Sequence, residues 1–218
     1  MVTPLRILIV DDHAVVRRGV RSLLESEEGF EITGEATTGR EAVDMARRLQ
    51  PDVIVMDLSL PELNGLDATR QILKESPRSE ILVLTMHHSE ELARDVLQAG
   101  ARGYVLKSDA DQSLIAAVTS LREHKPFLSS RVTEFVLDDY LRRTDALDDT
   151  LAHEAVTARE REIIQLLAEG QSNKKAASTL GISVKTIEAH RANIMRKLRL
   201  RSVSELVRYA IRNKIVQP

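Results

Sequence analysis

The chain has 218 residues, enough for one large domain or two small ones, and 29% of them are charged. It contains no cysteine, which excludes disulfides, thiolate catalysis and zinc–thiolate sites. No apolar run reaches the roughly 18 residues of a membrane span, and no basic region precedes a long apolar core near Met1. We therefore expect a cytoplasmic protein with neither a signal peptide nor a membrane partner.

The charges divide the chain into an acidic and a basic part. Residues 1–123 carry 14 Lys and Arg against 21 Asp and Glu, a balance of −7. Residues 124–155 carry 4 against 7, and residues 156–218 carry 13 against 5, a balance of +8. This asymmetry indicates two domains, and a basic domain often binds nucleic acid. A basic surface that only faces solvent is the alternative.

The first part alternates short apolar runs with helical patterns. The runs are residues 6–10, 31–35, 52–56, 81–84 and 103–106, and the helices span about residues 15–24, 38–49, 66–74, 89–99 and 111–122. Thr38 and Glu41 form a capping box that opens the second helix. Five repeats of strand and helix predict a parallel sheet with helices on both faces.

Polar residues follow four of these runs, where the predicted strands end. They are Asp11, Asp12, Asp57, Thr85 and Lys107. Because ligands of open α/β sheets bind outside the carboxyl ends of the strands, we expect all five to converge at one edge. The carboxylates could hold Mg²⁺, with one of Asp11 and Asp12 binding through water, and Asp57 could attack a phosphoryl group. The alternative for each residue alone is a helix cap or a solvated charge.

Residues 124–152 break the rhythm and predict a partly ordered linker between domains at residues 1–123 and 153–218. Pro126 ends the preceding helix, and we expect a short helix over about residues 131–141. From Val156 onward the pattern is only helical, and capping boxes at Thr157–Glu160 and Ser202–Glu205 mark two helix starts.

Between those two starts the sequence predicts a helix-turn-helix. Residues 173–180 and 183–198 have helical patterns, and Gly181 suits the left-handed residue of the turn between them. In the second helix the positions expected in the core are Val184, Ile187, Ile194 and Leu198. The positions expected on the opposite face are Lys185, Glu188, Ala189, Ala192 and Arg196.

Residues 5–123 resemble the receiver domain of two-component response regulators. The motifs are Asp11-Asp12, the stretch from Asp57 through Pro61 to Gly65, Thr85, and Tyr104-Val-Leu-Lys107. The resemblance implies a flavodoxin-like (βα)₅ fold with a doubly wound parallel sheet and Asp57 as the phospho-acceptor. It implies that Asp11, Asp12, Asp57 and the carbonyl of Ser59 bind Mg²⁺. Thr85 and Tyr104 would be the switch pair, and Lys107 would bind the phosphate.

Residues 156–215 resemble the LuxR-type helix-turn-helix of the NarL/FixJ response regulators, an all-α domain of four helices. The motifs run from Thr157-Ala-Arg-Glu160 through Ser172-Asn-Lys and Gly181-Ile-Ser-Val-Lys-Thr to His190 and Lys197-Leu. Two residues depart from the family pattern: Lys175 replaces a Glu that would cap the first helix, and Glu188 stands where many members have Lys. The resulting DNA-contact set is Lys174, Lys175, Lys185, Thr186, Glu188, Ala189, His190, Ala192, Asn193, Arg196 and Lys197.

The nature of these DNA contacts differs along the helix. Lys185 and Arg196 are expected at phosphates, while Glu188 could accept a hydrogen bond from cytosine, or simply face solvent. His190 could equally pack inside the domain or meet a phosphate. In the last helix, the apolar positions of residues 203–211 could form a dimer contact or be buried within their own domain.

We therefore interpret the chain as a transcriptional regulator rather than an enzyme. A sensor histidine kinase would phosphorylate Asp57, and a homodimer would then bind double-stranded DNA, with RNA polymerase as a further partner. One alternative is a Mg²⁺-dependent phosphotransferase of the haloacid-dehalogenase type, whose Asp-x-Asp signature is absent from Asp11-Asp12-His13. The other is a receiver that binds proteins without being phosphorylated. Acid-labile phosphate on Asp57 would discriminate among them.

Overall fold

The computed structural model describes residues 3–86, 89–129, 132–133 and 156–216. The chain forms two compact units, residues 1–147 and 148–218. Most of the expected helix at residues 131–141 lies outside the described residues. No helix in the described parts of the chain is long and apolar enough to span a membrane.

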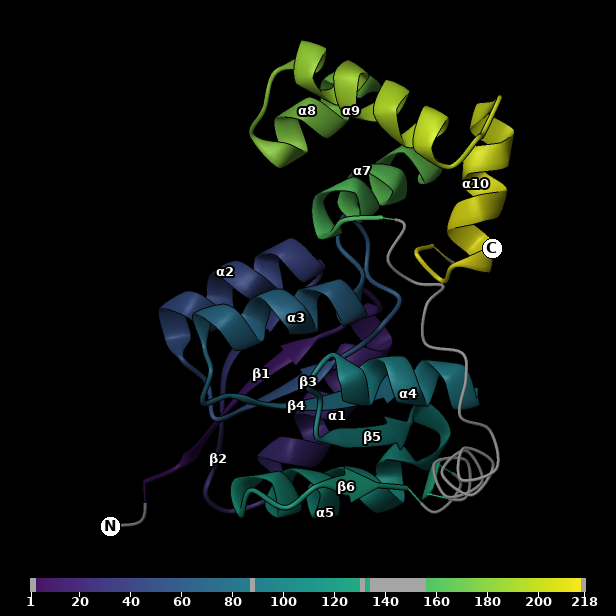
Figure 1. The fold of residues 1–218 in the computed structure, drawn as a ribbon. Coiled ribbons are helices and arrows are strands. Elements are labelled where there is room, and N and C mark those ends of the chain that lie inside the picture. The colour runs from purple at the N-terminus through teal and green to yellow at the C-terminus, as the bar shows by residue number, and fades with distance from the viewer. Residues whose placement is uncertain (1–2, 87–88, 130–131, 134–155, 217–218) are drawn as a thin grey trace. The chain divides into compact units, whose positions relative to one another are not determined.

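The first unit is built on a parallel sheet whose strand order is β2-β1-β3-β4-β5-β6 (Figure 1). Its strands are β1 (Leu5–Val10), β2 (Phe30–Ala36), β3 (Val53–Met56), β4 (Glu80–Thr85), β5 (Gly103–Leu106) and β6 (Phe127–Leu128). Every residue of β3 and β5 is buried, as expected for central strands covered on both faces. The predicted doubly wound α/β class is confirmed.

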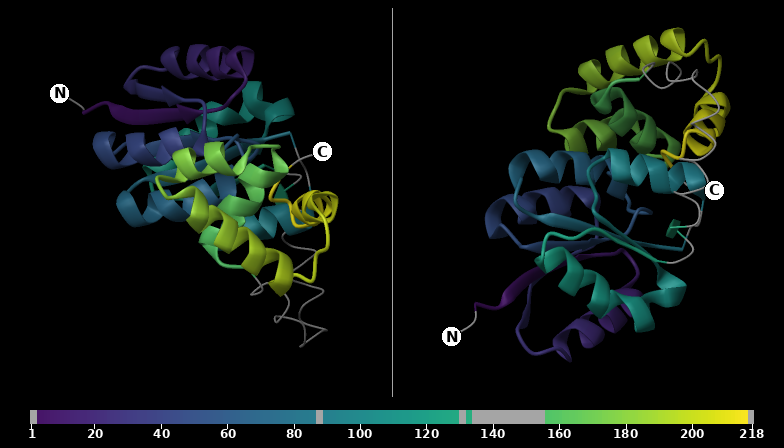
Figure 2. Two further views of the ribbon diagram at one scale, coloured as in Figure 1. Left: turned by 90° about the horizontal axis from the view of Figure 1, so that it is seen from above. Right: turned by 60° about the horizontal axis from the view of Figure 1, so that its bottom comes forward.

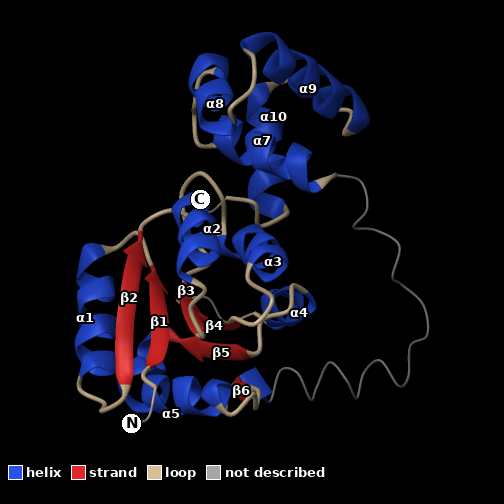
Figure 3. Ribbon diagram, turned by 90° about the vertical axis from the view of Figure 1, so that its left-hand side faces the viewer, coloured by secondary structure: helices blue, strands red, loops and turns tan. Residues whose placement is uncertain are grey.

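Helices cover both faces of this sheet, as the red strands between blue helices show in Figure 3. The helices are α1 (Ala14–Glu25), α2 (Gly39–Leu49), α3 (Gly65–Glu75), α4 (Glu90–Gln98) and α5 (Ala110–Arg122). One buried core lies under α1 and α5, and the other lies under α2, α3 and α4. The right-hand view of Figure 2 shows the two helical layers with the strands between them.

The sixth strand was not predicted. Residues 127 and 128, which we placed in the linker, pair with β5 through Gly103↔Phe127 and Tyr104↔Leu128. α5 ends at Arg122, before Pro126, and the chain then returns to the free edge of β5. Phe127 and Leu128 pack against the two apolar cores, and this long-range burial selects the strand. The predicted domain boundaries themselves stay a prediction.

The second unit consists of α7 (Ala158–Ala168), α8 (Asn173–Leu180), α9 (Val184–Lys197) and α10 (Val203–Arg212) around one apolar core. Gly181 ends α8 in the left-handed conformation, with φ 65°, as predicted for the turn of a helix-turn-helix. Thr157 and Glu160 form a complete capping box at α7. The predicted four-helix class of this unit is confirmed.

Two apolar positions of the second unit differ from expectation. Val184 was placed in the core but is 40% exposed, at the first residue of α9. Within α10, Leu206 and Ala210 are buried in their own domain, whereas Val203 is 44% exposed. A dimer contact through α10 therefore stays a prediction, carried by the exposed part of the stripe.

Candidate functional site

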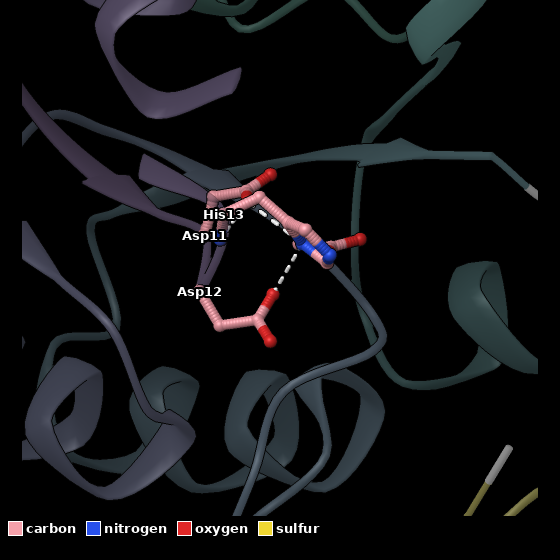
Figure 4. Close-up of side chains that lie close together, drawn as sticks. Asp11, Asp12 and His13 are labelled. Atoms are coloured by element: carbon pink, nitrogen blue, oxygen red, sulfur yellow. Dashed lines mark hydrogen bonds and ion pairs between the residues drawn. The ribbon is translucent and has the colours of Figure 1, made fainter. Parts of the chain in front are cut away.

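Two adjacent central strands place carboxylates at the same edge of the first unit. Asp11 follows β1 and Asp57 follows β3, and these strands pair in parallel through Val10↔Met56. Ligand atoms of Asp11, Asp12, His13 and Asp57 all lie within 4.8 Å of one another. Figure 4 shows Asp12 and His13 beside Asp11, with the carboxylate of Asp12 facing the imidazole ring. The three carboxylates expected at the strand ends thus lie close together.

A single ammonium group joins the two buried carboxylates. Lys107 Nζ lies 2.7 Å from Asp11 Oδ2 and 2.9 Å from Asp57 Oδ2. The three side chains are only 8%, 4% and 2% exposed, respectively. Lys107 reaches this place because it directly follows β5 and begins a short 3₁₀ turn. The site therefore contains a compact cluster of buried opposite charges.

Burial and charge act in opposite directions on these groups. Burial and the nearby charge of Asp11 raise the pKa of Asp57, and together they exceed the lowering by Lys107 and by the Leu58 N–H. Burial lowers the pKa of Lys107, but its interactions with Asp11 and Asp57 outweigh burial, and the net pKa is raised. These shifts favour the charged ammonium of Lys107 and disfavour the ionised form of Asp57. Such a carboxylate gains from any additional cation nearby.

The loop after Asp57 is held by close backbone contacts. The Leu58 N–H donates to Asp57 Oδ1 at 2.8 Å, and the Gly65 N–H donates to the Leu58 carbonyl at 2.9 Å. A Cβ at Gly65 would lie 2.0 Å from the Asp57 carbonyl oxygen, and one at Gly39 would lie 2.0 Å from the Leu63 carbonyl oxygen. Glycine is required at both positions, so the loop is held between the starts of α2 and α3.

Thr85 and Tyr104 occupy the neighbouring strands β4 and β5, and both are fully buried. Thr85 ends β4 and is opposite Leu106, while Tyr104 is opposite Val83. Burial raises the pKa of the Tyr104 phenol, which is therefore neutral. The side chain already points inward in this structure. The roles of Thr85 and Tyr104 as a switch pair stay predictions.

The carboxylates fit a Mg²⁺ ion in number and spacing. Mg²⁺ takes oxygen ligands at about 2.0–2.1 Å and keeps several waters, so ligands of one ion lie within about 4 Å of one another. The carboxylate oxygens here need only a small adjustment from their present spacing. Asp57 Oδ2 is buried, and its described interaction is the ion pair with Lys107. A role for the Ser59 carbonyl stays a prediction.

His13 belongs to this cluster, although the sequence analysis did not include it. Its Nδ1 lies 2.6 Å from Asp12 Oδ1, and its backbone N–H donates to Asp11 Oδ1 at 2.7 Å. The side chain is 64% exposed, in contrast to the buried Asp11. The only feature of the sequence that could have indicated His13 is its position directly after Asp11 and Asp12.

The predicted DNA-contact residues form a second candidate site, on α8 and α9 of the other unit. Those exposed are Lys174, Lys175, Lys185, Glu188, Ala189, Ala192, Asn193, Arg196 and Lys197. Thr186 and His190 are partly buried, and the Thr186 hydroxyl lies 2.8 Å from the Ser183 hydroxyl. Ile187 and Ile194 are buried on the opposite face of α9. One face of the helix is thus free to meet a partner.

Three of these exposed residues already have partners within the protein. Lys197 Nζ donates to Glu160 Oε2 at 2.8 Å, and this contact lowers the pKa of Glu160 against the effect of burial. Arg196 donates to Asn193 Oδ1 at 2.9 Å. Lys174, Lys175 and Lys185 are described without ion pairs, and Arg196 keeps its charge because Asn193 is neutral, so all four contribute positive charge to this surface.

Comparison with known families gives the class of this protein. Residues 7–119 match the response regulator receiver domain, and residues 154–210 match the bacterial regulatory proteins of the luxR family. The chain therefore belongs to the response regulators that join a receiver to a LuxR-type DNA-binding domain, the NarL/FixJ family. The resemblance stated from the motifs is confirmed.

Individual relatives agree with this assignment, and two of the three described here cover nearly the whole chain. The oxygen regulatory protein NreC of Staphylococcus carnosus is 40% identical over 215 residues, covering 97% of this chain and 99% of that protein. A LuxR-family response regulator from Aurantimonas is 34% identical with a TM-score of 0.61, covering 64% of this chain and 99% of that one. RcsB in complex with DNA is 28% identical with a TM-score of 0.60, covering 95% and 98%.

Proposed function

We propose that Asp57 of this response regulator accepts a phosphoryl group from a sensor histidine kinase. The observation that carries the proposal is the position of Asp57, buried beside Asp11 and in ion-pair contact with Lys107. Bound Mg²⁺, held by Asp11, Asp12, Asp57 and the Ser59 carbonyl, would supply positive charge to the phosphoryl oxygens.

The geometry distinguishes the two oxygens of Asp57. Oδ1 accepts the hydrogen bond from the Leu58 N–H, whereas Oδ2 faces Lys107. We therefore assign Oδ2 as the nucleophile: it forms the new O–P bond while the P–N bond to the donor histidine breaks. Lys107 would then pair with the phosphoryl group instead of with both carboxylates. Thr85, at the end of β4, would bind the same group through its hydroxyl.

Phosphorylation of purified protein by a small phosphodonor tests this step. Incubation with acetyl phosphate and Mg²⁺ should attach one acid-labile phosphoryl group, mapped to Asp57, and removal of Mg²⁺ should abolish it. Asp57→Asn should abolish labelling. Asp52→Asn should not, because Asp52 directly precedes β3 and so lies at the opposite end of that strand. Undiminished labelling of the Asp57→Asn protein would refute the assignment. Absence of any label would favour the receiver that only binds proteins.

We further propose that the phosphorylated protein binds double-stranded DNA as a homodimer, with α9 in the major groove. The exposed face of α9 and the charge of +8 over residues 156–218 support this proposal. One related structure contains RcsB dimers bound to DNA. Because each neutralised phosphate releases counterions, binding should weaken steeply with added salt.

Two variants separate phosphate contacts from base contacts. Lys185→Ala should weaken binding to all sequences alike, whereas Glu188→Ala should relax the preference at one base pair. Both are measured on duplexes selected from a random pool, with sedimentation to count the bound chains. A uniform loss from Glu188→Ala would show that this residue does not read a base. Monomeric binding by the phosphorylated protein would refute the dimer.

A further inference from the structure

One arginine contacts the acidic loop without being part of its charge cluster. Arg17, on the second turn of α1, donates from Nη1 to the backbone carbonyl of Asp11 at 2.8 Å. The same guanidinium donates from Nε to Glu35 Oε2 at 2.8 Å. Its side chain is only 17% exposed, so these contacts are largely shielded from water. The guanidinium therefore connects the loop to a residue of β2.

Both backbone polar groups of Asp11 are held, one directly by the end of β2 and the other through Arg17. The Asp11 N–H donates to the Ala36 carbonyl at 3.1 Å, and the Asp11 carbonyl is held by Arg17. Arg17 is in turn held by Glu35, the residue before Ala36 in the strand. The backbone orientation of Asp11 decides where its carboxylate points, and that carboxylate contacts Lys107 and the His13 N–H.

We propose that Arg17 is a positioning residue that fixes the Asp11 carboxylate for metal binding and phosphoryl transfer, with Glu35 as its anchor. This inference rests on the proposed function of the site. The planar guanidinium suits the task because its fixed fork serves two acceptors on different elements at once. A lysine at this place offers a single ammonium on a flexible stem, and it cannot hold both acceptors in the same geometry.

The chain provides a matched control on the same helix. Arg21, one turn further along α1, donates to the same carboxylate at Glu35 Oε1, with a distance of 2.6 Å, and also to Glu25 at 2.8 Å. It has no described contact with the Asp11 loop. Arg21→Lys therefore perturbs the same ion pairs of Glu35 without removing a contact to the Asp11 loop. Arg17→Lys keeps the positive charge but removes the guanidinium that contacts both Glu35 and the Asp11 carbonyl.

The test is a calorimetric titration of the full-length protein with Mg²⁺, together with thermal unfolding in the absence of metal. Loss of a group that holds a metal ligand in place typically weakens metal affinity by about 10–100-fold. We expect Arg17→Lys to raise the dissociation constant for Mg²⁺ at least about tenfold, and Arg21→Lys to leave it unchanged. The Mg²⁺ concentration needed for half-maximal labelling of Asp57 should shift by the same factor.

The outcomes separate the inference from the proposed function. If the unmodified protein neither binds Mg²⁺ nor becomes labelled on Asp57, the proposed function is wrong and this inference fails with it. If the unmodified protein does both but Arg17→Lys and Arg21→Lys behave alike, Arg17 has no positioning role. Should Arg17→Lys not fold, Glu35→Gln decides: it keeps an acceptor for Arg17 but weakens the anchor, and an unchanged Mg²⁺ affinity there would overturn the proposal.

Discussion

Replacing Lys107 by methionine should destabilise the metal-free protein strongly. Methionine keeps the length and flexibility of the side chain but removes the charge that faces Asp11 Oδ2 at 2.7 Å and Asp57 Oδ2 at 2.9 Å. Both carboxylates are nearly fully buried, so water cannot replace the lost ammonium. Two carboxylates of like charge would then remain close together, shielded from solvent.

The size of the effect follows from burial. Removing one partner of a buried ion pair typically lowers the free energy of unfolding by about 3–5 kcal/mol. Mg²⁺ should restore much of this loss, because a ligand at one hundred times its dissociation constant stabilises by about 2.7 kcal/mol. Since Lys107 no longer neutralises the two carboxylates, Mg²⁺ should stabilise the variant more than it stabilises the unmodified protein.

The dependence on pH gives an independent check of the same reasoning. Burial already raises the pKa of Asp57, and Lys107 is the main group that lowers it, so the variant should raise that pKa further. A carboxyl group whose pKa is higher in the folded than in the unfolded state costs stability while it is ionised. The cost is relieved as the pH falls through the folded-state pKa. The deficit of Lys107→Met should therefore shrink from neutral pH toward acid pH.

Urea unfolding followed by circular dichroism measures these differences, with and without Mg²⁺ and at several pH values. Lys125→Met is the matched control, because Lys125 Nζ lies 2.6 Å from Glu123 Oε2 but this ion pair is exposed to solvent. The control should not change the midpoint measurably. Equal midpoints for Lys107→Met and the unmodified protein without Mg²⁺ would refute the role of Lys107 in neutralising the two carboxylates.

Two further predictions concern a loop and a helix start. Gly65→Ala should lower the unfolding temperature and slow labelling of Asp57, because its Cβ would lie 2.0 Å from the Asp57 carbonyl oxygen; Gly19→Ala, which has open space, should instead stabilise α1 by up to about 1 kcal/mol. Lys175→Glu should stabilise the second unit by roughly 0.5–1 kcal/mol by completing a capping box with Ser172, whose hydroxyl already accepts from the Lys175 N–H, and should weaken DNA binding. Lys174→Glu, which adds the same charge without the box, controls for the charge alone; equal stability changes in the two lysine variants would exclude the capping explanation.

The geometry of the acidic site could be predicted because it depends on strand ends. Asp11, Asp57 and Lys107 each directly follow a buried apolar run, and parallel pairing of β1, β3, β4 and β5 brings such positions together. The α8–α9 turn was equally accessible, since Gly181 and the capping residues mark the helix ends locally. In both cases the deciding interactions lie close in sequence or follow from the order of the strands.

The features that were missed depend on contacts between distant residues. β6 has only two residues, and pairing with the edge of β5 decides its conformation. Val184 fits the apolar stripe of α9, but the stripe cannot show that α9 begins at this residue and leaves it exposed. Arg17 and Glu35 lie 18 residues apart on a helix and a strand, and neither belongs to a motif that indicates the other.

The Lys107 ammonium, which neutralises the resting site, would also have to change partners in the proposed switch. At rest Lys107 serves both Asp11 and Asp57, so a phosphoryl group on Asp57 would have to draw the ammonium away from Asp11. The loop that carries Asp57 cannot move alone, because its backbone touches Gly39 of α2 and Gly65 of α3 at distances that exclude even a methyl group. A change of charge at Asp57 would therefore act on packed helices as well as on side chains. Packed elements respond to such a change by moving between discrete arrangements, which is the property that a two-state regulator requires.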